Sequence, residues 1–81
     1  MRAKMLDLMR TMANGIVADE AMAAELAAAA TRMEAAGCAT ETATLHFLAR
    51  RHRIKALKLQ GSLAALREEY VSRFHDAGEG P

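Results

Sequence analysis

The sequence predicts an all-α protein, an antiparallel two-helix hairpin of the coiled-coil type. Hydrophobic residues make up 52% of the chain and are mostly Ala and Met, a composition that favours helices over strands. Apolar residues also recur at spacings of three and four on both sides of Gly37, the pattern of two amphipathic helices joined by a short turn. A chain of 81 residues would be only marginally stable alone, so we expect oligomerisation or a partner to complete the hairpin.

The first predicted helix covers residues 3–36. Its apolar seam keeps a spacing of four and three residues through four heptads, with Asp19 as the only polar member. Asn14-Gly15 could form a turn, but the spacing continues across it, so we expect one continuous helix with a weak point there. The seam consists of Met5, Met9, Met12, Ile16, Asp19, Ala23, Leu26, Ala30 and Met33. A second, shallower stripe that would let a neighbouring helix approach closely consists of Leu6, Ala13, Val17, Ala24, Ala28 and Ala35.

Residues 37–40 form the predicted turn. Gly37 can adopt the left-handed conformation that often ends a helix. Thr40 is the expected N-cap of the next helix, and Glu41 would then lie in its first turn, where a negative charge interacts favourably with the helix dipole. A connection this short makes the two helices antiparallel.

The second predicted helix covers residues 41–75 and carries two apolar stripes on opposite sides. We expect the first helix to cover the inner stripe, with Leu59 and Leu63 near Ile16, Ala23 and Leu26. The inner stripe consists of Leu45, Leu48, His52, Ala56, Leu59, Leu63, Leu66 and Tyr70. The outer stripe consists of Phe47, Ile54, Leu57, Gly61, Ala64 and Ala65. The hairpin domain would span residues 1–76, and residues 77–81 would form a disordered tail.

The outer stripe has no partner within the hairpin, which predicts a protein-binding surface. Phe47, Ile54 and Leu57 would be its apolar anchors. Arg50 and Arg53 would form its polar rim, and Gly61 and Ala64 would allow a neighbouring backbone to approach closely. The expected occupant is either a second copy of the chain or a helical partner protein. We therefore expect a small adaptor or co-chaperone.

A cluster of basic residues in the second helix leaves a further alternative open. Arg51, Lys55 and Lys58 share one flank of the helix, whereas Arg50 and Arg53 lie on the other. These residues could be solvated or could bridge to an acidic partner or to Asp19, Glu20 and Glu25 of the first helix. The alternative is a basic homodimeric hairpin that binds nucleic acid. Because the net charge is only +1 and no aromatic residues interleave with the arginines, the protein-binding interpretation is favoured.

No catalytic, cofactor-binding or metal-binding motif is evident, so an enzyme is not expected. The three histidines are not spaced as a helical metal site requires. The thiol of Cys38 lies in the turn near Glu34, Glu41 and His46, but no third group is placed to orient a nucleophile. A single cysteine, the absence of a signal-peptide pattern and the shortness of every uncharged run predict a cytoplasmic protein without a membrane span.

Several features occur together between Met22 and Leu66. The first helix is rich in Ala and Leu, a glycine turn is followed by an acidic residue, and an aromatic residue lies early in the second helix. The positions concerned are Leu26, Ala30, Met33, Gly37, Cys38, Glu41, Phe47, Ala56, Leu57, Gly61, Leu63 and Leu66. In these features the chain resembles the small helical-hairpin co-chaperones of type III secretion needle subunits, the YscE/PscE kind. The resemblance implies a hairpin that holds a larger helical-repeat chaperone, the pair sequestering the needle subunit before export.

Overall fold

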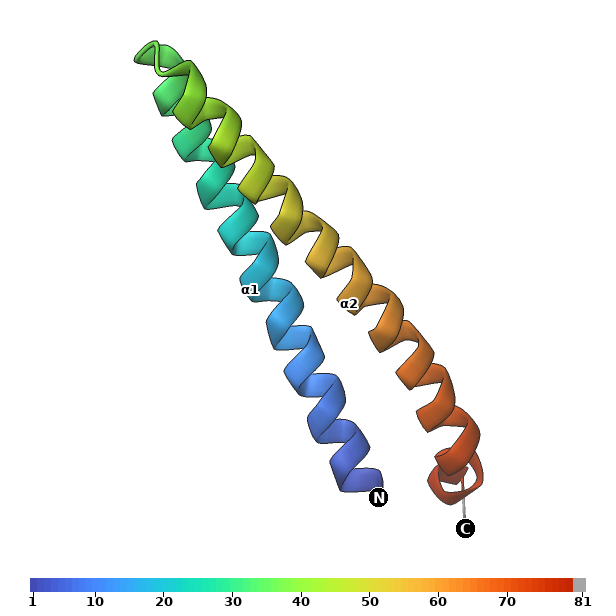
Figure 1. Cartoon of the computed structure of the whole chain (residues 1–81). Helices are drawn as coiled ribbons and strands as arrows, with labels where there is room; N and C mark the ends of the chain where they lie inside the picture. The colour runs from blue at the N-terminus through green and yellow to red at the C-terminus, as the bar shows by residue number, and fades with distance from the viewer. Residues whose placement is uncertain (80–81) are drawn as a thin grey trace.

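The protein is an antiparallel hairpin of two long helices, as the sequence predicts (Figure 1). The computed structural model describes the backbone of residues 1–79 and the side chains of residues 1–74. Helix α1 spans Arg2–Ala35 and helix α2 spans Ala39–Glu79. The hairpin measures 65 × 16 × 13 Å, so it is a rod rather than a globule.

Helix α1 runs without interruption through Asn14 and Gly15, which confirms the continuous helix. Gly15 lies against α2: a Cβ atom built on it would be 3.2 Å from the Cδ1 atom of Leu59. The missing side chain therefore leaves room for the end of the Leu59 side chain at this point.

The turn is a Schellman motif centred on Gly37, whose φ of 80° is in the left-handed region. The Cys38 amide donates to the Met33 carbonyl at 2.9 Å, and the Gly37 amide donates to the Glu34 carbonyl at 3.0 Å. The next helix begins earlier than expected. Because α2 starts at Ala39, Thr40 lies inside its first turn and is not the N-cap, whereas Glu41 occupies the first turn as predicted.

The helices pack along one seam in which both keep the spacing of four and three residues. The inner stripe expected on α2 is buried or half-buried throughout. The seam also includes Ala49, which is fully buried and was missed; Leu48 flanks the seam beside it. The α2 seam consists of Thr42, Leu45, Ala49, His52, Ala56, Leu59, Leu63, Leu66 and Tyr70. Extending the α1 spacing to the second helix would have found Ala49.

Two polar contacts define the register of the helices. Asp19 meets His52, and the Nε atom of Arg2 donates to the Tyr70 hydroxyl at 2.7 Å. Leu63 consequently belongs to a core cluster with Ile16 and Ala56. Partly buried hydrophobic residues packed against this cluster are Met9, Met12, Ala13 and Leu59. Leu59 and Leu63 were expected near Ile16, and the three residues belong to or pack against one core cluster. They were also expected near Ala23 and Leu26, but these two residues lie between Asp19 and the turn, away from the cluster.

The carboxyl end of α2 also differs from expectation. Residues 77–79, expected as part of a disordered tail, are helical. No proline precedes residue 80, so every amide up to Glu79 can donate to a carbonyl four residues earlier. Residues 80–81 of the expected tail lie outside the described residues.

Candidate protein-interaction surface

One side of the hairpin gathers exposed apolar residues from both helices. In each helix, the residue after a seam position lies about 100° further around the helix, so all such residues share one side of that helix. In the hairpin this side of α1 and this side of α2 face the same way. Residues from both of them line one shallow groove, namely Glu20 of α1 and Arg53, Leu57 and Gln60 of α2, beside Ala56 of the seam. We call this surface the Leu57 face. Its apolar members are Leu6, Ala13, Val17 and Ala24 on α1 and Leu57, Ala64 and Val71 on α2.

The large side chains of the Leu57 face are well exposed. Val17 is 66% exposed, Leu57 is 64% exposed and Val71 is 58% exposed. They lie in the half of the rod away from the turn, because Val71 is near the open end and Val17 and Leu57 are near the level of Asp19. An apolar line of this extent on both helices is typical of a surface that another helix covers.

The structure divides the outer stripe predicted from the sequence. All of its anchors are exposed, with Phe47 at 55% and Ile54 at 44%. Leu57 and Ala64 belong to the Leu57 face together with the two rim residues Arg50 and Arg53. Phe47, Ile54 and Gly61 instead lie on the back of α2, and a Cβ atom on Gly61 would meet no other atom within 4 Å.

Sequence reasoning treated the shallow stripe of α1 and the outer stripe of α2 as separate features. The structure joins Leu6, Val17 and Leu57 on one side and adds Val71, which was missed. The signal for Val71 was available, since it follows Ala64 by one heptad. The opposite side of the hairpin also exposes Leu8 and Met22, among many charged residues. It includes Lys4, Glu25, Arg32, Arg51, Lys55, Lys58 and Glu69.

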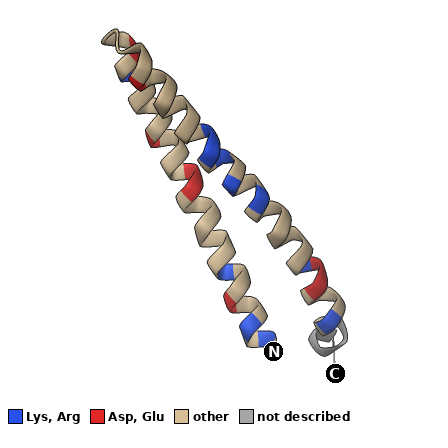
Figure 2. Ribbon diagram, in the orientation of Figure 1, with Lys and Arg blue, Asp and Glu red and all other residues tan. Residues whose placement is uncertain are grey.

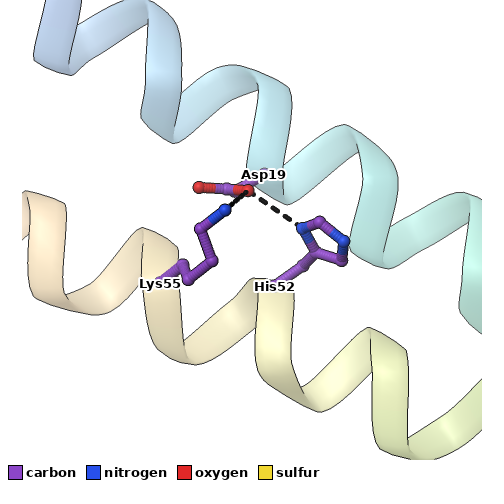
Figure 3. A network of polar contacts seen from close by, with 3 residues as sticks. All are labelled: Asp19, His52 and Lys55. Carbon is purple, nitrogen blue, oxygen red and sulfur yellow. Dashed lines mark hydrogen bonds and ion pairs between the residues drawn. The ribbon is translucent and has the colours of Figure 1, made fainter.

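A polar layer interrupts the apolar seam near its middle (Figure 3). Asp19 is only 9% exposed, and one of its carboxylate oxygens lies 2.9 Å from His52 Nδ1 and 3.6 Å from Lys55 Nζ. The hydrogen bond with His52 lowers the pKa of Asp19, burial partly opposes this shift, and the positive charge of Lys55 adds to it. Because a buried carboxylate is costly without these partners, the layer favours the observed register over slipped ones.

Most of the basic residues of α2 gather on a short stretch of that helix (Figure 2), and part of this cluster makes contacts within the hairpin. Lys55 pairs with Asp19, and the guanidinium of Arg51 lies 5.9 Å from the centre of the Phe47 ring. The expected bridge to Asp19 is therefore present. Among the described side chains, however, the ion pairs between the two helices all involve Asp19, and Glu20 and Glu25 form none.

The turn carries the one cysteine of the chain. Cys38 is a free, half-buried cysteine. An open depression beside the turn is lined by Glu34, Thr42 and His46 but not by Cys38. Within the described residues, no three His, Cys, Asp or Glu side chains are grouped so that they could hold a metal ion.

Comparisons with known proteins give no indication of function. No protein-family model, curated protein or solved structure matches this chain. Neither helix, over the part that the structure describes, is long and apolar enough to cross a membrane.

Proposed function

We propose that this chain is a non-enzymatic protein-interaction module, a small adaptor or co-chaperone that binds a helical partner through the Leu57 face. The observation that carries the proposal is the line of exposed Leu6, Val17, Leu57 and Val71, to which both helices contribute. A co-chaperone of the type III secretion kind is the specific form that the sequence resemblance favours.

The hydrophobic effect supplies the driving force for such binding. Removing apolar surface from water stabilises a complex by about 25 cal/mol per Å². The seam between α1 and α2 is one layer deep, so neither helix can turn Leu57 or Val17 inward without exposing its own seam residues. A helix laid along the Leu57 face would cover these side chains while leaving the hairpin intact.

The polar and peripheral residues have different expected roles. Arg50 and Arg53 border the apolar line and would act mainly on the association rate, because rim charges remain hydrated. Arg53→Ala should weaken binding modestly and mostly at low salt. Ile54 lies on the back of α2, outside the Leu57 face, so Ile54→Asp should weaken assembly less than Leu57→Asp, and neither should reduce the helix content.

Site-specific photo-cross-linking tests the proposal directly. A photoreactive residue is placed at position 57, with position 58 as the matched control because Lys58 is also exposed and points to the other side. Irradiation in host cells should give protein adducts at position 57 and far fewer at position 58. Equal yields at the two positions, or no adduct at either, would contradict binding through this face.

Nucleic-acid binding is the second candidate, on the evidence of the five basic residues Arg50, Arg51, Arg53, Lys55 and Lys58. The ion pair of Lys55 with Asp19 counts against it, because it reduces the positive charge free for phosphate. Fluorescence anisotropy with labelled DNA and RNA separates the two functions. Binding that falls steeply between 50 and 200 mM salt would favour this second candidate, as release of counterions requires.

A further inference from the structure

We infer that the Leu57 face is covered by a second copy of this chain, with the twofold axis parallel to the long axis of the hairpin. Both turns then lie at the same end of a four-helix bundle. This inference rests on the proposed function, since it names the occupant of the same face. It follows from the exposed area of the hairpin and from the placement of charge on the two helices.

The hairpin exposes more surface than a compact protein of its mass. Its accessible surface is 5861 Å² for a mass of 8.8 kDa. A compact monomer of that mass exposes about 4,800 Å², so the excess is roughly 1,100 Å². The hairpin is 65 Å long and 16 Å wide, so one broad side measures about 1,000 Å² in projection, and a standard interface buries about 800 Å² per partner. One identical hairpin is therefore long enough to cover the whole face.

The charges on the Leu57 face are divided between the helices. The α1 half carries Glu20 and Glu34, with Arg10 as the exception, whereas the α2 half carries only positive charge. Its charged residues are Arg50, Arg53 and Arg67. A lengthwise twofold axis places α1 of each copy against α2 of the other, so Glu20 faces the basic half of α2, whereas Glu34 lies beside the turn and Arg67 near the open end. The face is thus electrostatically complementary to itself in this arrangement.

The register makes this complementarity specific. Glu20 directly follows Asp19, and Arg53 directly follows His52, which Asp19 contacts. Glu20 and Arg53 therefore lie at the same level of the rod and line the same groove. Rotation about the lengthwise axis keeps every level unchanged, so Glu20 of one copy meets Arg53 of the other.

An end-over-end twofold axis gives the opposite result. It would place α2 against α2 of the second copy, with the turns at opposite ends. Asp19 lies near the middle of α1, which spans Arg2–Ala35, so the level of Arg53 is also near the middle of the part of the rod in which the two helices are paired. Arg53 would then face Arg53 of the second copy, and like charges placed together are unfavourable.

A label on Cys38, the single cysteine, shows whether two copies associate and whether their turns lie at the same end. Cys38 is spin-labelled in the intact chain, and the distance between labels is measured by pulsed electron paramagnetic resonance beside the mass from light scattering. A mass of twice 8.8 kDa is expected, with labels within about 30 Å, since adjacent helices pack 8–10 Å apart. An end-over-end dimer would separate the labels by roughly 50 Å, the length of a 34-residue helix.

Neighbouring exposed residues on α1 supply a matched pair of variants. Val17→Asp places a charge on the Leu57 face and should shift the dimer to monomer, whereas Ala18→Asp places the same charge on the opposite side and should leave the dimer intact. Circular dichroism checks that both variants keep their helix content. Equal effects of the two substitutions on the dimer would overturn the inference.

Charge reversal tests the contact between copies without disturbing apolar packing. Glu20→Arg and Arg53→Glu should each weaken self-association at least tenfold, and mixing the two variants should restore a dimer, because every contact between copies then joins opposite charges. Absence of preferential pairing in the mixture would overturn the lengthwise arrangement.

Failure of this inference can be distinguished from failure of the proposed function. A chain that stays monomeric at 200 µM, yet cross-links at position 57 to a different protein, refutes the second copy and leaves the binding function standing. A monomeric chain without a position-specific adduct refutes both.

Discussion

Replacing Leu63 with alanine tests the packing that holds the hairpin together. Leu63 is 5% exposed and belongs to the core cluster with Ile16 and Ala56. Truncating a buried leucine to alanine costs about 2–5 kcal/mol, depending on how far the neighbours close the cavity. The seam here is a single layer with solvent on both sides, so its flexible neighbours Met9 and Met12 can move inward, and we expect a loss in the lower half of that range.

The assay is thermal and urea unfolding followed by circular dichroism. For a domain of this size each kcal/mol shifts the Tm by about 4–8 °C, so a loss of about 2–3.5 kcal/mol in Leu63→Ala should lower the Tm by roughly 8–28 °C. The matched control is Leu8→Ala, because Leu8 is 47% exposed and lies outside the core cluster. Its effect should be less than half as large. A smaller loss of stability for Leu63→Ala than for Leu8→Ala would refute the packing described for the seam.

Three further predictions concern the polar layer and two glycines. The partners of Asp19 lower its pKa, so the stability it contributes is present above its ordinary pKa and is lost as the pH falls through the lowered value. The Tm should consequently decline more between pH 6 and pH 3 in the unmodified protein than in Asp19→Asn, and equal declines would contradict this. Gly37→Ala should lower the free energy of unfolding in urea by about 1–2 kcal/mol. A φ of 80° is strained for any residue with a Cβ atom, even though the space around Gly37 is open. An unchanged urea midpoint would argue against the left-handed turn. Gly15→Ala should stabilise the protein by roughly 0.5 kcal/mol. The gain of about 1 kcal/mol in helix propensity exceeds the cost of moving the Leu59 methyl group by a few tenths of an ångström. A lower Tm would show that the Leu59 side chain cannot move away.

The features that depend on local spacing could be predicted from the order of the residues alone. The seam of α1 from Met5 to Met33 follows from intervals of three and four residues, and the left-handed Gly37 follows from its place after the last seam residue. The exposure of Phe47, Ile54 and Leu57 was predictable for the same reason, because residues opposite a seam cannot also lie within it. Such features need only the helical period and the conformational freedom of glycine.

The alignment of the two helices relative to each other could not be predicted in this way. The helical period fixes the faces of each helix separately, but it does not say which residue of one helix is opposite which residue of the other. The Schellman turn and the contact of Asp19 with His52 set that register, which moved Leu63 away from Ala23 and toward Ile16. The same register brings Val17 and Leu57 onto one side of the hairpin. The Leu57 face therefore exists only in the folded hairpin, because it joins residues from two helices whose alignment depends on contacts distant in the sequence.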